Sequence, residues 1–322
     1  MRVVADSDLD GLMAAAVLKA SKPEIEVHFA HPALLRSGNL DHLIDRQTAI
    51  CDLPFHKDCG LYLDHHLTNR PTHKEEVEFE STGGICHWRD TPSAARAAFD
   101  LMKDELDLSH LEEVMPIVDA LDSGGISLQE FMEDGPIIRL SRSLSMSDPE
   151  HMQEVMHQFA SGMELEDILE SHKSRLEDLK QEREIMAEIV RNCTKIIDEL
   201  AICDLSETGH RSNGYLVTAL AGSDAVACCV IHGYMDGSIE DVNRPALGAS
   251  FYANSFRVEE NPYDLSILAT LLDETGGGHA NACGCRIQPS DGSNRNLIQG
   301  DKESNLENWI EKWSKRDTEM KR

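Results

Sequence analysis

The chain has 322 residues, of which 41% are hydrophobic and 5% aromatic, and it carries a formal net charge of −28. Its length suffices for two domains that each bury their own core. The excess of carboxylates opposes tight, non-specific binding of long nucleic acid, which depends on Lys and Arg. The same excess is typical of surfaces that keep proteins soluble in a salty cytosol, and composition alone does not separate the two interpretations.

Targeting signals are not evident in the sequence. No apolar run approaches the roughly 18 residues that span a bilayer, and the charged, strand-like start is unlike a signal peptide. The nine cysteines are odd in number and follow no regular spacing, which indicates reduced thiols. We therefore expect a cytoplasmic protein without a membrane partner.

Residues 1–145 alternate short apolar segments with helix-forming ones, which is typical of an α/β domain with a mostly parallel sheet. Strands are predicted at 3–5, 24–30, 48–52 and 61–63, and helices at 11–20, 40–46, 91–102 and 108–122.

Acidic side chains stand at the ends of three of these apolar segments. The segments run, in order, into Asp6, Asp8 and Asp10, into Asp52, and into the triplet Asp64, His65 and His66. In open α/β sheets a crevice lies beyond the carboxyl ends of the strands, and carboxylates and neutral imidazoles are ligands for divalent metals. Three acids in the first loop argue against a phosphate cradle, which needs glycines and backbone N–H groups. The pattern therefore predicts a metal site.

Residues 146–200 are dense in Glu, Lys, Leu, Ile and Met at helical spacing, which predicts a helical connector. Beyond it, strands are predicted at 201–203, 215–220, 225–231 and 245–252, and helices at 263–272 and 303–315, in a smaller α/β domain over 201–322. The last helix places Trp309 and Trp313 on one packed face. Between the two helices lies the loop Gly276–His279, where successive glycines let N–H groups converge on an anion and His279 can donate to it.

The sequence resembles the DHH phosphoesterase superfamily, in the branch that ends with a DHHA1 domain. The matching stretches are, in order, Asp6–Gly11, Asp52, Asp64–His66, Asp119–Gly125 and Gly276–Gly284. They span nearly the whole chain. The resemblance implies a DHH catalytic domain over 1–145, the connector, and a DHHA1 substrate-binding domain over 201–322, with the active site in the cleft between the domains.

Two positions depart from the pattern of the family. Many relatives carry a His where this chain has Val4, and others carry it two residues later, where this chain has Asp6. Asp6 is therefore expected to replace that ligand. Many relatives also carry a substrate-binding Arg at the position of Tyr252, and Arg257 is expected to supply that charge instead.

The resemblance also implies two Mn²⁺ ions per chain, with Mg²⁺ as the second choice. The first ion would be held by Asp6, Asp8 and Asp52, and the second by Asp10, Asp52, His65 and Asp122, with Asp52 bridging the two. The expected catalytic residues are Asp52, His65 and His66. Asp64 and Asp119 are expected to support the site. The expected substrate-binding residues are His66, Gly276, Gly277, Gly278, His279 and Arg257.

The expected activity is two-metal hydrolysis of phosphodiester or phosphomonoester bonds in short oligonucleotides or small nucleotides, because few basic residues are available to hold a long strand. Three alternatives stay open: a single-stranded nucleic acid exonuclease, a pyrophosphatase or polyphosphatase, and a degenerate member that binds a nucleotide without catalysis. Val4 and Tyr252 favour the last alternative, whereas the remaining carboxylates and both histidines argue against it. The sequence leaves the physiological substrate and the oligomeric state open.

Overall fold

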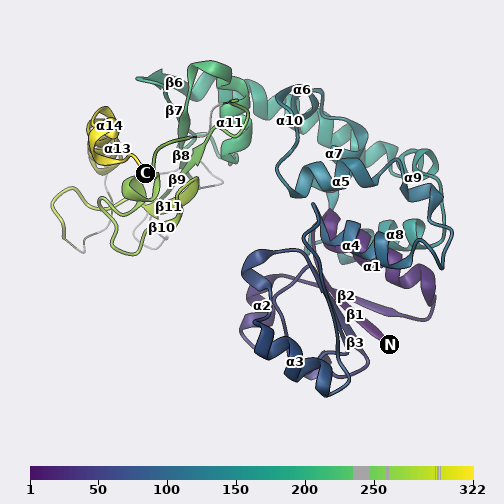
Figure 1. The fold of residues 1–322 in the computed structure, drawn as a ribbon. Coiled ribbons are helices and arrows are strands. Elements are labelled where there is room, and N and C mark those ends of the chain that lie inside the picture. Colours follow the sequence, from purple (N-terminus) through teal and green to yellow (C-terminus); the bar gives the residue numbers. More distant parts are fainter. Residues whose placement is uncertain (235–246, 259–260, 294, 296, 298) are drawn as a thin grey trace. The chain divides into compact units, whose positions relative to one another are not determined.

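The computed structural model describes residues 1–234, 247–258, 261–293, 295, 297 and 299–322 (Figure 1). These residues divide into two compact units, Met1–Lys180 and Gln181–Arg322. The stretch predicted as a connector, 146–200, is shared between the units, and helix α10 (Lys173–Cys193) runs across their boundary. None of the described helices is long and apolar enough to cross a membrane.

The first unit is built on a five-stranded sheet in the order β2-β1-β3-β4-β5. Its strands are β1 (Arg2–Asp6), β2 (Glu26–Ala30), β3 (Thr48–Cys51), β4 (Leu61–Asp64) and β5 (Ile85–Trp88). Every neighbouring pair is parallel, which confirms the mostly parallel sheet. The carboxyl ends of parallel strands meet at one edge, so the residues that follow the neighbours β1, β3 and β4 come together there.

Alternate residues of β1 face two different cores. Val3 and Ala5 pack in one cluster with α1 (Leu9–Ser21), α4 (Ala94–Met102) and α8 (Pro149–Ala160). Val4 packs in another cluster with residues of α2 (Pro32–Arg36) and α3 (His73–Ser81). Figure 1 shows these two sets of helices on opposite sides of the sheet. Both faces are thus covered, which explains why the strands read as continuous apolar runs.

Shorter elements complete the first unit. They are η1 (Asp41–Leu43), η2 (Leu67–Asn69), η3 (Ser109–Leu111), α5 (Met115–Asp122), α6 (Leu128–Glu133), α7 (Pro136–Ser143) and α9 (Leu165–Ser171). The helix predicted at 40–46 is only the 3₁₀ turn η1. The helix predicted at 108–122 is divided into η3 and α5, because Pro116, near the start of α5, has no N–H with which to continue a helix from η3.

The second unit is built on a six-stranded mixed sheet in the order β10-β11-β9-β8-β7-β6. Its strands are β6 (Thr194–Ile197), β7 (Leu200–Asp204), β8 (Ala227–His232), β9 (Gly248–Ala253), β10 (Gly277–His279) and β11 (Ala282–Arg286), and its helical segments are α11 (Gly214–Ala221), η4 (Gly222–Asp224), α12 (Ser266–Ala269), α13 (Gln299–Ser314) and α14 (Arg316–Glu319). Trp309 and Trp313 of α13 are buried against the sheet with Phe251 of β9, as their spacing predicts.

Three predicted elements of this half differ from the structure. The strand predicted at 215–220 is the helix α11, which Asn213 caps by accepting from Leu216 N at 3.2 Å. The helical part of the predicted connector ends at Cys193, and the chain continues as β6, which turns into β7 at Asp198 and Glu199 with positive φ of 49° and 63°. The helix predicted at 263–272 is confined to α12. Of the strand predicted at 245–252, residues 245–246 lie outside the described part of the chain.

Candidate metal centre

Strand β1 delivers three acids to the edge of the first sheet. Asp6 is its last residue, Asp8 caps α1 by accepting from Gly11 N at 2.9 Å, and Asp10 lies in the first turn of that helix. Gly11 permits this tight path, because a Cβ there would come within 2.5 Å of the backbone oxygen of Asp6. The loop is thereby held against the end of β1.

The carboxylate of Asp10 is buried at the N-terminus of α4. Its two oxygens accept from Ala94 N at 2.8 Å and from Ala95 N at 2.7 Å, where the helix dipole favours a negative charge. Each carboxylate oxygen has further lone-pair positions. These bonds therefore fix the orientation of Asp10 and still leave it able to bind a cation.

Asp52 follows β3 with a φ of 57°, a left-handed conformation that is uncommon for a residue other than glycine. Its N–H donates to Leu63 O of β4 at 3.0 Å. Its Oδ1 is buried and accepts no hydrogen bond, and it lies 3.8 Å from His65 Nε2 and 3.4 Å from His66 Nδ1. A buried carboxylate oxygen without a donor is costly, so the position calls for a cation.

The ring of His65 has a defined tautomer. Its Nδ1 lies 3.1 Å from Thr91 O, and because a carbonyl oxygen only accepts, Nδ1 carries the proton. In the neutral ring, Nε2 then holds a lone pair, and this atom is buried without a hydrogen bond. The oxygens nearest to it belong to Asp122 at 3.0 Å, Asp10 at 3.7 Å and Asp52 at 3.8 Å. Acceptors from four side chains thus converge, as a metal centre requires.

Asp64 orients the second histidine. Its side chain is fully buried, and its Oδ1 accepts from His65 N at 2.7 Å, His66 N at 3.0 Å and His66 Nδ1 at 3.1 Å, while its Oδ2 accepts from Tyr62 Oη at 2.7 Å. Burial opposes its charge, but the hydrogen bonds from His66 and Tyr62 prevail and lower the pKa of Asp64. With its oxygens so engaged, Asp64 is held against both histidines, and its supporting role stays a prediction.

The structure separates the roles of the two acids of α5. Asp122 lies beside His65, whereas Asp119 accepts from Ser93 Oγ at 2.7 Å and from Arg96 Nη2 at 2.6 Å. Ser93 is the N-cap of α4. Asp119 therefore helps to hold the start of the helix that fixes Asp10, and its role in the site stays a prediction.

The carboxylates of the site repel one another. Burial raises the pKa of Asp10 and of Asp52, and nearby carboxylates raise both further. Burial and the charge of Asp8 also raise the pKa of Asp6, to about 6. Ligand atoms within 4.8 Å of one another form two groups that share His65: the first is Asp52, Asp64, His65 and His66, and the second is Asp10, His65 and Asp122. A divalent cation would relieve this repulsion, so the donor set fits a metal.

Asp6 and Asp8 lie outside those two groups. Asp8 still feels the charges of Asp122 and His66. Asp6 Oδ1 lies 3.8 Å from His31 Nδ1, which in turn lies 3.0 Å from Ser7 Oγ. His31 was not among the site residues predicted from the sequence. A signal for it was present, since His31 directly follows the predicted strand 24–30 just as the other site residues follow their strands.

In the second unit the residues of the Gly-rich loop form an edge strand. Gly277 and Gly278 have φ of 155° and 135°, and a Cβ on Gly278 would come within 2.7 Å of Ala282 O. His279 pairs with Ala282 of β11, which pairs on its other side with Tyr252 of β9. Residues opposite one another in antiparallel strands share a face, so Tyr252 and His279 belong to one row. Gly276, which precedes β10, is packed so closely that a Cβ would come within 2.3 Å of Ala269 O.

Arg257 lies elsewhere on this unit. Its guanidinium donates to Ser223 O at 3.0 Å, and it lines a cavity of about 200 Å³ together with Asn254 and Tyr263. Arg257 is thus held by the backbone beside this cavity, and its predicted role in substrate binding stays a prediction.

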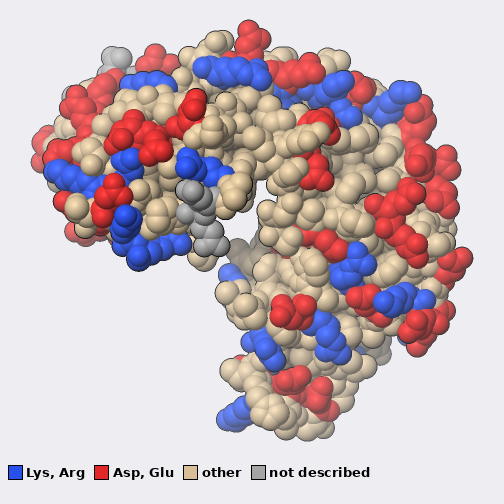
Figure 2. Space-filling view, turned by 45° about the horizontal axis from the view of Figure 1, so that its top comes forward, with Lys and Arg blue, Asp and Glu red and all other residues tan. Residues whose placement is uncertain are grey.

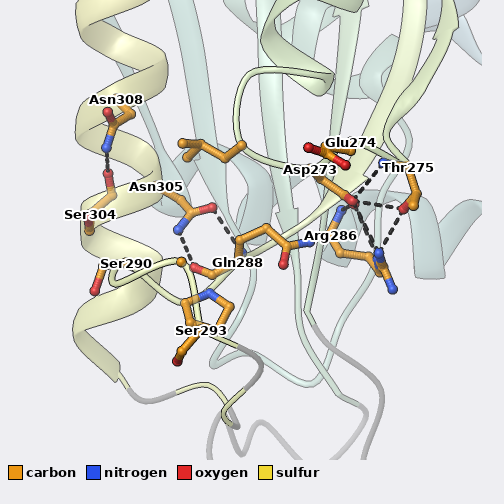
Figure 3. A pocket seen from close by; sticks show the side chains of 13 residues that line it. Asp273, Glu274, Thr275, Arg286, Gln288, Ser290, Ser293, Ser304, Asn305 and Asn308 are labelled. Carbon is orange, nitrogen blue, oxygen red and sulfur yellow. Dashed lines mark hydrogen bonds and ion pairs between the residues drawn. The ribbon is translucent and has the colours of Figure 1, made fainter.

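A larger cavity of about 510 Å³ lies beside the residues that precede the Gly-rich strand (Figure 3). Several of its polar side chains are bonded to other residues of the lining. Arg286 Nη2 lies 3.2 Å from Asp273 Oδ1, and Asn305 Nδ2 donates to Gln288 O at 2.7 Å. The cavity thus offers amide and hydroxyl groups, and its Arg286 is already paired with a carboxylate.

Comparison with protein-family models and with curated proteins found no match. Solved structures do match. PggH from Vibrio cholerae, described as a pGpG-specific phosphodiesterase, is 20% identical with a TM-score of 0.77, and the match covers 98% of this chain and 99% of PggH. The exonuclease RecJ bound to manganese is 12% identical with a TM-score of 0.56, over 99% of this chain and 90% of RecJ.

RecJ from Thermus thermophilus in complex with Mn²⁺ is 13% identical with a TM-score of 0.52, and the match covers 96% of this chain but 52% of that protein. PggH and RecJ are members of the DHH superfamily. The chain has the fold of the DHH phosphoesterases. The predicted resemblance in fold is thereby confirmed over nearly the whole length of this DHH-fold chain.

Proposed function

We propose that this chain is a divalent-metal-dependent phosphodiesterase that hydrolyses short oligonucleotides, with a dinucleotide as the first substrate. The observation that carries the proposal is the convergence of Nε2 of His65 with carboxylate oxygens of Asp10, Asp52 and Asp122. A fold shared over 98% of the chain with a pGpG-specific phosphodiesterase supports the same class of reaction.

We propose Mn²⁺ as the metal, because mixed imidazole and carboxylate ligands suit it and both RecJ structures hold manganese. The proposed ligands are those predicted from the sequence: Asp6, Asp8 and Asp52 for one ion, and Asp10, Asp52, His65 and Asp122 for the other. When bound, divalent cations neutralise charge on the phosphoryl group and lower the pKa of a water nucleophile.

Residues of this chain are proposed to orient the metal ligands and to bind the substrate. Thr91 O and the N-terminus of α4 fix His65 and Asp10, so the ligands are positioned before the substrate arrives. The carboxylates of Asp52 and Asp64, whose Oδ1 atoms lie 3.4 Å and 3.1 Å from His66 Nδ1, raise the pKa of His66 to about 11. In the metal-free protein His66 is therefore positively charged at neutral pH. Its half-exposed ring is proposed to donate from Nε2 to a phosphate oxygen.

The second unit is proposed to hold the substrate through the row that contains His279 and Tyr252. Tyr215, which is about half exposed, lies with its ring centroid 6.2 Å from that of Tyr252, and such aromatic faces suit a nucleobase. On the face drawn in Figure 2, Lys and Arg are intermixed with Asp and Glu and form no continuous basic track. This distribution favours a short substrate over a long strand.

The test is a panel of substrates assayed with Mn²⁺: a 5′-phosphorylated dinucleotide, a 3′,5′-bisphosphonucleoside, a single-stranded DNA of about 20 residues, and pyrophosphate. The proposal predicts that hydrolysis of the dinucleotide is fastest and that activity falls as the oligonucleotide lengthens. Faster cleavage of the long strand at physiological salt would replace the proposal with an exonuclease. Exclusive hydrolysis of pyrophosphate would replace it with a pyrophosphatase.

A matched pair of variants shows whether the metal centre performs the reaction. Asp52→Asn removes the proposed bridging ligand, whereas Asp58→Asn changes an exposed Asp in the loop that follows β3. Loss of dinucleotide hydrolysis in Asp52→Asn alone supports the proposal.

The free thiols of all nine cysteines are in keeping with a proposed cytoplasmic location.

A further inference from the structure

A second group of metal-ligating side chains lies in the first unit, on helices that the proposed function does not use. It consists of His151 and Glu154 of α8 and His172, which follows the last residue of α9. One ligand atom of each lies within 4.8 Å of the others. The histidines are buried, with exposed fractions of 4% and 7%, and their rings meet edge to face with centroids 4.9 Å apart.

The tautomer of His151 follows from its hydrogen bond to Ser143. The hydroxyl of Ser143 donates its only proton to Leu140 O at 2.6 Å. Ser143 Oγ must therefore accept in its contact with His151 Nε2 at 2.8 Å, so Nε2 of His151 carries the proton. The neutral ring then presents an unprotonated Nδ1.

The tautomer of His172 follows from a longer chain of bonds. Ser171 Oγ donates to Ile168 O at 2.7 Å, so it accepts from the amide nitrogen of Gln158 at 3.1 Å. This fixes the amide and directs its oxygen at His172 Nε2, at 2.8 Å. An amide oxygen only accepts, so Nε2 of His172 carries the proton and Nδ1 holds the lone pair.

Both imidazoles are thus arranged as metal-binding histidines are, with one ring nitrogen donating to an oxygen and the other free to bind. Neither Nδ1 takes part in a hydrogen bond with another described residue. Burial lowers the pKa of both rings, so they are neutral at pH 7. Glu154 stands three residues after His151, which places the two on one side of α8.

We propose that His151 Nδ1, His172 Nδ1 and the carboxylate of Glu154 form a second metal site, which takes Zn²⁺. Two imidazoles and one carboxylate are a common zinc ligand set, and zinc tolerates a water as its fourth ligand. One ligand atom of each residue lies within 4.8 Å of the others, and zinc bonds of about 2.0–2.2 Å require the three atoms to come closer together than this upper bound. The exposed side chain of Glu154 has the freedom to close that distance.

The charges around the site permit a cation. Arg175 is the nearby cation whose charge helps to lower the pKa of both histidines. Its guanidinium is paired with the carboxylate of Asp148 at 2.8 Å. Glu154 brings the negative charge that a divalent ion needs. The ion would join the middle of α8 to the junction of α9 and α10, the helix that crosses the boundary of the two units. Its expected role is structural, since its ligands lie outside the Asp10–His65–Asp122 group.

The experiment measures zinc retained after metal stripping, loading with Zn²⁺ and desalting. Its samples are the wild-type protein and the variants Glu154→Gln, His172→Ala and His157→Ala. His157 is an exposed histidine of the same helix and serves as the matched control. Wild type and His157→Ala should retain one zinc per chain more than the other two. Because Glu154 is exposed, its variant should fold normally, and its zinc affinity should fall on the order of tenfold or more.

Two further measurements separate this site from the proposed catalytic centre. The Asp52→Asn variant should keep the additional zinc, so the site stands even where the proposed function fails. Loading with Co²⁺ should give visible absorption bands that Glu154→Gln loses and His157→Ala keeps. Equal zinc content and equal Co²⁺ spectra in wild type and Glu154→Gln would overturn the proposal and leave the two histidines as packing residues.

Discussion

The positioning role of Asp64 gives a prediction whose size follows from its contacts. In Asp64→Asn the amide oxygen can take the place of Oδ1, which accepts from His65 N, His66 N and His66 Nδ1. The amide nitrogen then faces Tyr62 Oη, which can accept from it because this hydroxyl also lies 3.0 Å from Asn69 O and can donate there. The substitution therefore removes the charge and keeps the hydrogen-bond geometry.

The expected magnitude is the difference between charged and neutral hydrogen bonds. A bond to a charged group contributes about 1.5–3 kcal/mol and a neutral one about 0.5–1.5 kcal/mol. If the hydrogen bond that orients the ring of His66 contributes about 1–1.5 kcal/mol less to stabilising the transition state, kcat/KM should fall roughly tenfold. Metal content should not change, because the oxygens of Asp64 are occupied by these donors. The pKa of His66 should fall but stay raised, since its contact with the carboxylate of Asp52 at 3.4 Å is the larger cause.

The assay combines steady-state hydrolysis of the dinucleotide, elemental analysis and NMR titration of the His66 ring. Wild-type kcat/KM in Asp64→Asn would show that orientation of His66 does not matter to the reaction. Loss of manganese in this variant would show that Asp64 is a ligand, and the assignment of its role would be wrong.

Three further predictions concern other parts of the site. His279→Ala should leave metal content unchanged and lower kcat/KM on the order of tenfold to a few hundredfold, if it removes one charged hydrogen bond of about 1.5–3 kcal/mol; loss of metal, or wild-type kinetics, would refute that role. His31→Ala should lower kcat/KM by roughly threefold to tenfold, because its hydrogen bond to Ser7 Oγ, next to Asp6, is lost and such a bond contributes about 0.5–1.5 kcal/mol. The variant His42→Ala, which changes an exposed histidine, should leave kcat/KM unchanged. The rise in Tm that Mn²⁺ causes should be larger at pH 8 than at pH 6. The pKa of Asp6 is raised to about 6, and the pKa values of Asp10 and Asp52 are raised as well. Protonation of these carboxylates therefore stabilises the metal-free protein below about pH 4, and this stabilisation is lost as pH rises through the raised pKa values. An equal rise in Tm at both pH values would contradict this.

The fold and the N-terminal acids could be predicted because their signals are local. The strands β1, β3 and β4 of the first sheet are apolar runs, and Asp6, Asp52 and Asp64 stand where these runs end. The strand β5 (Ile85–Trp88) was not predicted, because its residues are only partly buried and include a histidine. The helix α13 was predictable because Trp309 and Trp313 repeat at helical spacing. In these cases a short stretch of sequence specifies both the element and its buried side.

The remaining features depend on contacts between distant residues. Tyr215–Leu220 reads as a strand by composition, and the cap from Asn213 together with packing against the second sheet makes it helical. The tautomer of His65 depends on Thr91 O, 26 residues away. The Gly-rich stretch Gly277–His279 pairs with β11 as an edge strand, because Gly278 fits closely against Ala282 and Cys283. No periodicity in the sequence records such partners.

The most direct test of the proposed metal centre is a Mn²⁺ titration of the metal-free protein, followed by assay of dinucleotide hydrolysis at each point. The wild type and Asp58→Asn should bind about two Mn²⁺ per chain at the N-terminal acids and gain activity in proportion. Asp52→Asn should bind less manganese and remain inactive. If Asp52→Asn matches the wild type in both binding and turnover, the centre around His65 is not the site of the reaction.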